Sequence, residues 1–387
     1  MTQLQNFIVR SGRATVHFGP NAINALERWV SQFRRVFIVT SRRAARVSGA
    51  LDDVLSILTK LGVKYEHYDG VVPNPSTRIA NDVGERVWRF GAEAIVAIGG
   101  GSVIDVAKIA SIIAECGGKA EEYIKRVREV CAALPVAAIN LTHGTGSEIN
   151  RYAVATIEET HEKLSVASDH IYPAISIDDP RYLKTLPKNQ TIYTSLDALY
   201  HAIEAATTKT SSPYTVMLGE EVVKLIAKWL PVALQQPENL EARYWLLYAS
   251  MLAGIAIDHG RTHLVHAMEH ALSGLKPELA HGAGLAILGP HIVIHIYRAM
   301  PEVMHRLLRH LDPSLEPTPD HAEKASEALA RFQRSVGFTE RLSDYGFTPE
   351  HFDTVARLTM ESTRYLIDLA PFNVTIDMLK EVYAKAL

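Results

Sequence analysis

The first half of the chain alternates short apolar runs with longer segments whose apolar positions recur at helical spacing. Such runs, bounded by glycine, proline or polar residues, predict buried strands, and the longer segments predict amphipathic helices. The predicted strands cover 35–41, 63–72, 92–100 and 135–142, with predicted helices at 47–62, 79–91 and 103–115. This βαβαβαβ order predicts a parallel sheet covered by helices. The segments 153–168 and 173–180 predict an antiparallel pair and a final strand.

Apolar runs that predict strands become rare after Pro187, and the spacing of the later apolar residues is typical of packed helices. We therefore predict an N-terminal α/β domain over residues 1–186 and an all-α domain over residues 187–387. The segment 313–323 holds three prolines and predicts a surface loop.

Composition excludes several classes of partner. The net charge is −3 and no run of five like charges occurs, so the sequence gives no sign of a charged surface for binding nucleic acid or an anionic membrane. The N-terminal segment lacks a signal-peptide core, and the most apolar later run, 284–297, is too short and too rich in histidine to span a bilayer. Cys116 and Cys131 lack C-x-x-C spacing, which argues against a disulfide framework or a thiolate metal site. We expect a cytoplasmic protein, in a reducing compartment, that binds small molecules.

A glycine-rich turn follows the third of these predicted strands. Gly99, Gly100 and Gly101 lead into a helix predicted to start at Ser102, where free N–H groups favour the phosphates of a nucleotide. The alternative is a plain tight turn, since Ser102 and Asp105 have capping-box spacing. The turn also lacks the G-x-G-x-x-G pattern of a dinucleotide site.

A second glycine-rich loop, "NLTHGTGSEIN" at 140–150, follows the next strand and offers the hydroxyls of Thr142, Thr145 and Ser147. Two adjacent phosphate cradles predict a dinucleotide, although two unrelated turns remain the alternative. The first sheet strand leads into Ser41, Arg42 and Arg43 instead of the acid that usually holds an NAD ribose. This difference favours NADP over NAD.

Histidines and an aspartate recur at helical spacing in the second half. Asp197 and His201 lie four residues apart, and His266 and His270 repeat that spacing. His281 stands beside glycines. One carboxylate with three imidazoles suits Fe²⁺ or Zn²⁺, and the missing thiolates disfavour a structural zinc.

With these motifs, the chain resembles the iron-containing, or group III, alcohol dehydrogenase family over nearly its whole length. The motifs stand in the family's order: "GVVPNPST", "GGGSVIDVAK", "GTGSE", "IDDPRYLKTLP", "DALYHAIEA", "HAMEHALSG" and "HGAGLAILGPH". The resemblance implies an N-terminal dinucleotide-binding domain of Rossmann-like type and a helical metal-binding and substrate domain, an architecture shared with dehydroquinate synthase. It also implies an active site between the domains and a homodimer or larger oligomer.

The resemblance also implies roles for particular residues. The metal ligands are Asp197, His201, His266 and His281, and His270 is a pocket residue near the nicotinamide. The cofactor-binding residues are Ser41, Arg42, Asn74, Gly99, Gly100, Gly101, Ser102, Asp105, Thr142, Thr145, Ser147, Lys163 and Leu183.

Several positions depart from the family pattern. His259, Arg261 and His263 replace small or neutral residues; they line a polar pocket mouth or meet solvent, or else Arg261 or His259 selects a polar or acidic substrate. Leu141 and His143 stand in the triplet before "GTGSE", where relatives have Thr-Thr-Ala, so one hydroxyl contact to the cofactor is lost.

The predicted activity is hydride transfer between NAD(P) and a small alcohol or aldehyde. A divalent metal would lower the pKa of the alcohol, and His270 would relay its proton. Two alternatives come from other classes: a lyase of the dehydroquinate synthase type, and a non-catalytic sensor that binds a nucleotide and a metal. The lyase would need a carboxylate-His-His metal set and a basic phosphate pocket, which the sequence does not offer.

Overall fold

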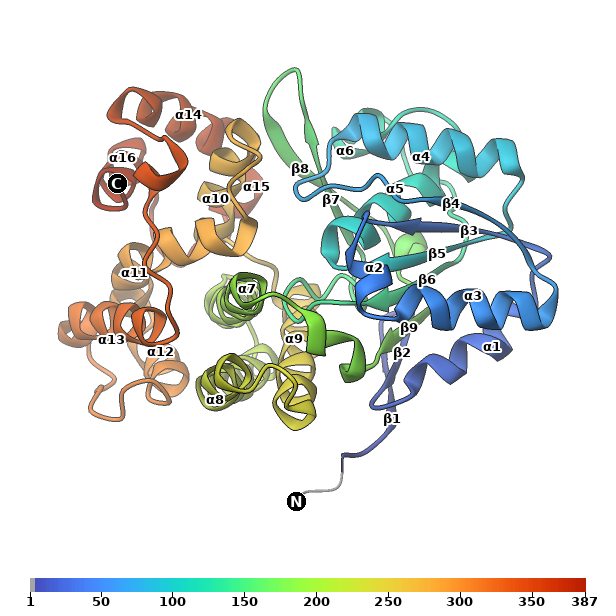
Figure 1. The fold of residues 1–387 in the computed structure, drawn as a ribbon. Coiled ribbons are helices and arrows are strands. Elements are labelled where there is room, and N and C mark those ends of the chain that lie inside the picture. The colour runs from blue at the N-terminus through green and yellow to red at the C-terminus, as the bar shows by residue number, and fades with distance from the viewer. Residues whose placement is uncertain (1–3) are drawn as a thin grey trace. The chain divides into compact units, whose positions relative to one another are not determined.

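The computed structural model describes residues 4–387, which divide into two compact units. Of the described residues, the first unit comprises 4–160, 164–187 and 236–247, and the second comprises 161–163, 188–235 and 248–387. The main division falls between Pro187 and Lys188. Figure 1 shows the elements of each unit along the chain.

The first unit is built on a seven-stranded sheet in the order β1-β2-β9-β6-β5-β3-β4. All neighbouring strands pair in parallel except β1 with β2. The sheet strands are β1 (Phe7–Ser11), β2 (Ala14–Phe18), β3 (Arg35–Thr40), β4 (Lys64–Tyr68), β5 (Ala94–Gly99), β6 (Val136–Asn140) and β9 (Ile175–Asp178). Strands β7 (Tyr152–Ile157) and β8 (Glu162–Ala167) form a separate two-stranded sheet. The predicted α/β fold class with a mostly parallel sheet is confirmed, and the β1–β2 hairpin is an addition to it.

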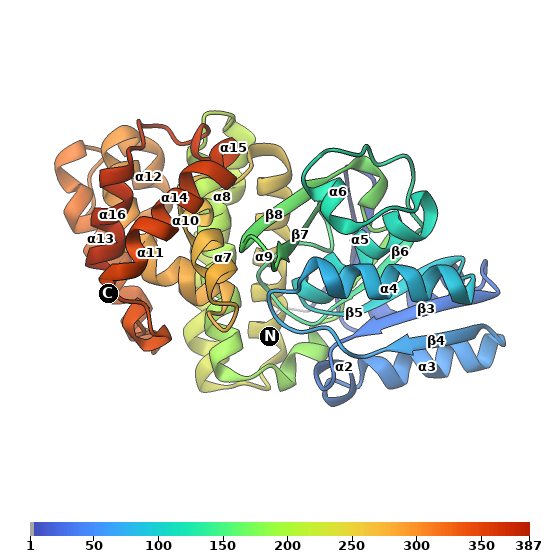
Figure 2. The ribbon, with the colours of Figure 1, turned by 90° about the horizontal axis from the view of Figure 1, so that it is seen from above.

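Helices cover both faces of this sheet because its central strands are apolar on both sides. The helices of the unit are α1 (Ala25–Val30), α2 (Ala44–Val47), α3 (Ala50–Leu61), α4 (Thr77–Phe90), α5 (Gly101–Cys116) and α6 (Ala120–Ile124). One core packs α1 and α3 against the sheet, and a second packs α4 and α5 against it. Figure 2 shows α3 and α4 on opposite sides of β3.

The expectation that the two cysteines stay unpaired is wrong. Cys116, the last residue of α5, forms a disulfide with Cys131. The chain turns back through Gly117 and Gly118, both at positive φ, and brings two residues that lie 15 apart in the sequence to a Cα distance of 6.2 Å. This turn of the chain allows the disulfide to form, although the sequence has no C-x-x-C spacing that would predict it. The cysteines therefore give no support to the expected reducing compartment.

The second unit is helical. Its helices are α7 (Lys188–Thr207), α8 (Pro213–Gln235), α10 (Leu264–Leu275), α11 (His281–Ala299), α12 (Pro301–Leu308), α13 (Ala322–Ser335), α14 (Phe352–Ser362), α15 (Arg364–Ile367) and α16 (Ile376–Lys385). Helix α9 (Leu240–Gly260) contributes its first residues to the first unit and the rest to the second. Helix α7 is buried along almost its whole length after Thr191, and α8, α10 and α11 pack around it.

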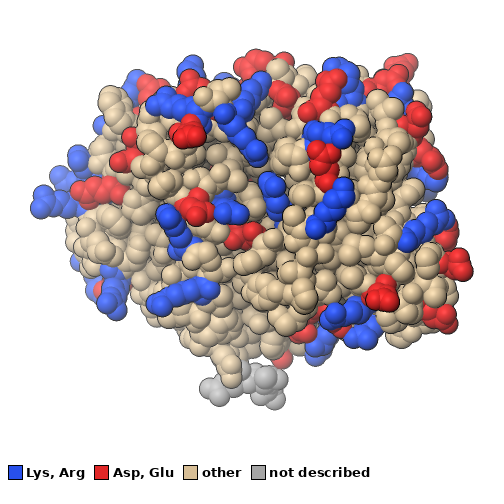
Figure 3. All heavy atoms as spheres, turned by 180° about the vertical axis from the view of Figure 1, so that it is seen from behind, with Lys and Arg blue, Asp and Glu red and all other residues tan. Residues whose placement is uncertain are grey.

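One face of the molecule mixes both signs of charge. On the face drawn in Figure 3, Lys and Arg side chains are interspersed with Asp and Glu side chains, and no broad single-sign patch forms. Among the described residues, no helix has the length and apolarity that a bilayer crossing requires.

Candidate active site

The predicted metal ligands converge in the second unit from three helices. Asp197 and His201 lie one turn apart on α7, His266 is in the first turn of α10, and His281 is the first residue of α11. The Asp197 Oδ1 atom lies 3.4 Å from His201 Nδ1, 3.8 Å from His266 Nε2 and 3.7 Å from His281 Nε2. Side chains from widely separated sequence positions therefore surround one carboxylate oxygen.

This cluster fits a divalent metal. Asp197 Oδ1 and His266 Nε2 are buried, and neither has a hydrogen-bond partner within the described part of the chain. Burial alone would raise the pKa of Asp197, but the adjacent His201, His266 and His281 lower it to about 2, so the carboxylate is ionised. Buried polar atoms without partners are rare and costly, and a bound cation would satisfy both. The set of one carboxylate and three imidazoles suits Fe²⁺ or Zn²⁺.

Glycines at the start of α11 bring His281 to this cluster. A Cβ atom on Gly282 would lie 2.0 Å from the Tyr193 carbonyl oxygen of α7, and one on Gly284 would lie 2.8 Å from Cγ of Glu269 on α10. Any larger residue would push α11 away from both helices. The glycines that follow His281 in the sequence therefore set the spacing of the site.

His270 lies beside the ligands without joining Asp197. Its ring centroid is 5.7 Å from that of His281 and 6.5 Å from that of His266. Burial and the positive charge of Lys163 lower the pKa of His270, so its imidazole is neutral near pH 7. Its Nδ1 atom is buried and accepts no hydrogen bond from any described residue. A neutral ring nitrogen is thus available beside the candidate metal position.

Sequence reasoning missed two buried glutamates in this unit, Glu204 and Glu269, which contact the candidate ligands His266 and His281. The available signal was a carboxylate inside a helical stretch that is otherwise apolar, because such a group is rarely buried without a partner. Lys163, which the resemblance places near the cofactor ribose, lies with its Nζ 3.3 Å from Glu269 Oε2 and 2.9 Å from Ser273 Oγ.

The two glycine-rich loops lie against each other in the first unit. Gly99 on β5 pairs with Asn140 on the neighbouring β6, so both loops leave the same edge of the sheet. A Cβ atom on Gly100 would lie 2.7 Å from Thr142, and one on Gly101 would lie 2.5 Å from Thr145. Close contact between the loops is therefore possible only with glycine at these positions.

The capping box at Ser102 and Asp105, which supported the alternative of a plain tight turn, does not form. Helix α5 begins at Gly101, and its N-cap Gly100 offers no side chain. Asp105 instead accepts hydrogen bonds from Ser147 Oγ, at 2.6 Å, and from the Val154 amide, at 3.0 Å. With the cap absent, the amides at the start of α5 lack a side-chain acceptor from the N-cap, and Asp105 serves to hold the neighbouring loop.

The buried Lys108 organises the second loop and was not singled out from the sequence. Its Nζ donates to the carbonyl oxygens of Ser147, Asn150 and Tyr152 at 2.6, 2.9 and 2.8 Å. Because one buried lysine binds three carbonyls of this segment at once, it fixes the path of the loop.

Strand order places these loops at a ligand-binding position. The first strand of the βαβ series, β3, lies between β4 and β5, so the chain reverses its direction across the sheet between β3 and β5. Ligands of open α/β sheets bind at such a switch point, beyond the carboxyl ends of the strands. Ser41, the exposed Arg42 and the exposed Arg43 follow β3 there, and the glycines follow β5. The third predicted strand, which carries the glycine-rich turn, therefore adjoins the first.

Asn74 and Leu183 are two further residues that were predicted to bind the cofactor. Asn74 adopts a positive φ of 47° in the loop before α4. Leu183 is fully buried in a short 3₁₀ helix, Pro180–Thr185. The side chain of Leu183 thus contributes packing in this unit.

Comparison with known proteins identifies the family. Residues 14–180 match the sequence model described as iron-containing alcohol dehydrogenase, and residues 191–387 match the C-terminal model of the Fe-containing alcohol dehydrogenase family. The long-chain primary alcohol dehydrogenase of Thermoanaerobacter ethanolicus is 41% identical over 380 residues, which cover 96% of this chain and 95% of that protein. The 1,3-propanediol dehydrogenase of Klebsiella pneumoniae is 33% identical, with coverage of 89% and 90%. The chain belongs to the iron-containing alcohol dehydrogenase family.

Solved structures agree with this assignment. An archaeal alcohol dehydrogenase from a Red Sea brine pool superposes with a TM-score of 0.92 at 27% identity, and 100% of each chain is covered. A 1,3-propanediol oxidoreductase superposes with a TM-score of 0.89 at 30% identity, again with full coverage of both. The chain is thus an alcohol dehydrogenase that interconverts alcohols and aldehydes with NAD(P).

Residues that depart from the iron-containing alcohol dehydrogenase pattern have structural explanations. His263 was expected at a pocket mouth or in solvent, and this is wrong, because it is fully buried. Its Nε2 lies 3.0 Å from Thr207 Oγ1 and its Nδ1 lies 3.2 Å from Glu204 Oε1. His259 is exposed, and its Nδ1–H donates to the Ile255 carbonyl one turn earlier. Arg261 is partly exposed, at a positive φ of 66°.

His143, in the triplet before "GTGSE", is also buried. Its Nε2 lies 3.4 Å from a guanidinium nitrogen of Arg243, which sequence reasoning did not single out. Burial, and secondarily the charge of Arg243, lower the pKa of His143 to about 3, so this ring is neutral. Its side chain therefore belongs to the interior of the first unit.

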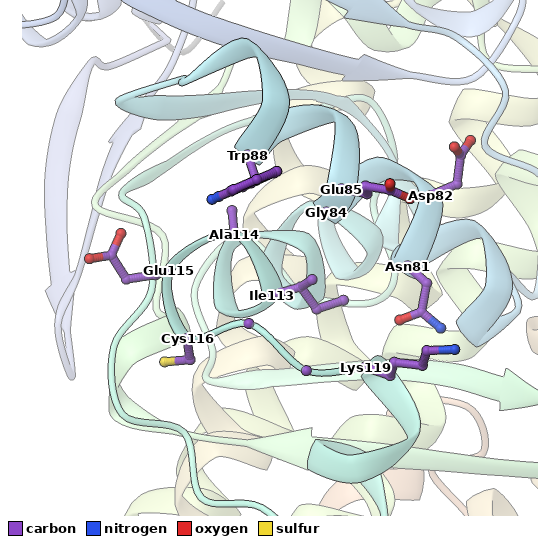
Figure 4. Close-up of a pocket in the computed structure, with 12 residues that line it drawn as sticks. Asn81, Asp82, Gly84, Glu85, Trp88, Ile113, Ala114, Glu115, Cys116 and Lys119 are labelled. Atoms are coloured by element: carbon purple, nitrogen blue, oxygen red, sulfur yellow. The ribbon is translucent and has the colours of Figure 1, made fainter.

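A hollow of about 670 Å³ lies on the first unit between α4 and α5. Figure 4 shows Trp88 and Glu115 at one part of it and Asn81 and Lys119 at another. None of the residues predicted to bind metal or cofactor lines this hollow.

Proposed function

We propose that this chain holds Fe²⁺, with Zn²⁺ as the alternative, on Asp197, His201, His266 and His281 and acts on primary alcohols and the corresponding aldehydes. The observation that carries the proposal is the pair of buried, unpartnered atoms Asp197 Oδ1 and His266 Nε2, 3.8 Å apart. The substrate class is supported by relatives described as long-chain primary alcohol, 1,3-propanediol and NADH-dependent butanol dehydrogenases.

The chemistry of such a site follows from its residues. When bound, a divalent metal acts as a Lewis acid that lowers the pKa of an alcohol hydroxyl and polarises an aldehyde carbonyl. When bound, the nicotinamide supplies or accepts the hydride. Nδ1 of His270, which is buried and has no hydrogen-bond partner among the described residues, would accept the proton of a substrate hydroxyl in alcohol oxidation and return it in aldehyde reduction.

For the cofactor, we propose NADP in preference to NAD, with the two glycine-rich loops on the pyrophosphate. Arg42 and Arg43 are exposed at the switch point, and no described residue forms an ion pair with either. Two free guanidinium groups there would favour a 2′-phosphate. We also propose a homodimer or larger oligomer, from the family resemblance.

The decisive experiment combines elemental analysis of the purified protein with steady-state kinetics. We expect about one metal ion per chain, turnover of primary aldehydes with reduced nicotinamide, and a higher kcat/KM with NADPH than with NADH. Asp197→Asn should lose the metal and the turnover together. Intact metal and nucleotide binding without turnover of any aldehyde would instead support a sensor.

A matched pair of variants tests the cofactor choice. Arg42→Ala should reduce kcat/KM for NADPH and leave that for NADH nearly unchanged. Arg46→Ala, an exposed arginine on α2, is the control for loss of one surface charge. Equal effects of both variants on the two cofactors would refute the NADP preference.

A further inference from the structure

Two ligand histidines are held in the same way, from the side away from Asp197. His266 Nδ1 lies 2.5 Å from Glu204 Oε2, while its Nε2 faces Asp197 Oδ1. His281 Nδ1 hydrogen-bonds Glu269 Oε2, while its Nε2 also faces Asp197 Oδ1. Each ring is thus fixed between a buried glutamate and the shared aspartate.

Glu204 is anchored by the start of the helix that carries His266. Its Oε1 accepts the Val265 amide at 2.6 Å, and its Oε2 lies 3.4 Å from the His266 amide. A carboxylate at a helix N-terminus is stabilised by free amides and by the helix dipole. Because Glu204 lies on α7, seven residues after Asp197, it joins the helix of two ligands to the helix of the third.

Glu269 is anchored differently. It is fully buried, and Lys163 Nζ lies 3.3 Å from its Oε2 and 3.4 Å from His281 Nδ1. The contact with the lysine supplies a positive charge that offsets burial of the carboxylate. Gly284 permits this arrangement, since a Cβ there would lie 2.8 Å from Glu269 Cγ.

We propose that Glu204 and Glu269 are positioning residues for the metal centre: each accepts the Nδ1 proton of one ligand histidine and so directs Nε2 of that ring to the metal. A neutral imidazole ligates through the nitrogen that carries no proton, so a carboxylate at Nδ1 selects the required tautomer and holds the ring in orientation. This inference rests on the metal site proposed above.

The test uses the full chain, stripped of metal with a chelator and reloaded with Co²⁺. Glu204→Gln and Glu269→Gln keep the size of each side chain and remove its charge. Each should raise the Kd for Co²⁺ by about 10- to 100-fold and shift the visible ligand-field bands of the bound ion. Glu220→Gln is the control, because Glu220 also accepts from several donors, Arg306 and Arg309, yet contacts none of the four ligands. It should leave both readouts unchanged.

The outcomes separate this inference from the metal site itself. Wild-type protein that binds no Co²⁺, or binds it equally well after Asp197→Asn, would refute the metal site and the positioning role together. Normal binding by wild type, with Kd and spectrum unchanged in the glutamate variants, would refute the positioning role alone. Should one variant not fold, the other decides, because each glutamate holds a different ligand.

Discussion

Glu148, in the second glycine-rich loop, should make the stability of the first unit depend on pH. Its side chain is fully buried, and neither carboxyl oxygen has a hydrogen-bond partner among residues 4–387. Burial raises the pKa of Glu148 to about 7. Asp178 is also buried, and burial together with the charge of Glu148 raises its pKa. A protonated Glu148 is therefore the form that the fold favours.

The magnitude and sign follow from proton linkage. A glutamate in the unfolded chain ionises near its ordinary pKa of 4.5, whereas folded Glu148 ionises near 7. The stabilisation is complete below the unfolded pKa and is lost as pH rises through the folded pKa. At about 1.4 kcal/mol per pKa unit, this difference costs about 3 kcal/mol in the free energy of unfolding between pH ~4.5 and pH ~7.

The perturbation is Glu148→Gln, because glutamine reproduces the shape of the protonated carboxyl and cannot ionise. Hydrogen exchange of β5 and β6 amides, corrected for intrinsic rates, would report the stability of the first unit across this pH range. We expect the wild type to lose about 3 kcal/mol more than the variant as pH rises. Glu85→Gln, at an exposed carboxylate, controls for the change in net charge. Parallel pH dependences in wild type and Glu148→Gln would refute the reasoning.

Three further predictions concern the site. His270→Ala should lower kcat and change its pH profile, and a retained profile with most of kcat would show that His270 relays no proton. Lys108→Met should destabilise the first unit by about 3 kcal/mol in denaturant unfolding, since two buried carbonyls and a partly buried one lose this donor; an equal stability would show that the loop is held by other contacts. Asp197→Asn should remove the metal-induced rise in Tm while leaving the apo protein folded by circular dichroism, and an undiminished rise would place the ion elsewhere.

The parallel sheet could be predicted because its strands are continuous apolar runs separated by helical segments. The β1–β2 hairpin could have been anticipated less easily, since its strands are only five residues long and β1 alternates between exposed and partly buried positions. Its two-residue connection at Gly12 was a local signal. The disulfide could not be foreseen, because it depends on how the chain returns after α5.

The candidate metal ligands could be selected in part from the sequence, because spacing of four residues places two side chains on one helical face. Spacing alone could not predict that α7, α10 and α11 lie side by side. The family resemblance supplied that prediction. Glu204, Glu269 and Lys108 were missed because a charged residue in an amphipathic helix is usually exposed, and their burial depends on partners remote in sequence.

The four histidines between residues 259 and 270 show what distinguishes a functional imidazole from a structural one. Burial does not, because His263, His266 and His270 are all buried. The lack of a hydrogen-bond partner does not either, because Nδ1 of His263 has none among the described residues, and neither do Nε2 of His266 and Nδ1 of His270. What differs is the group that each ring approaches. Nε2 of His266 lies 3.8 Å from Asp197 Oδ1 and the ring of His270 lies 5.7 Å from that of His281, whereas Nδ1 of His263 lies 3.2 Å from Glu204 Oε1. His266 and His270 therefore lie at the candidate metal centre, and His263, through its contact with Glu204, belongs to the support of that centre.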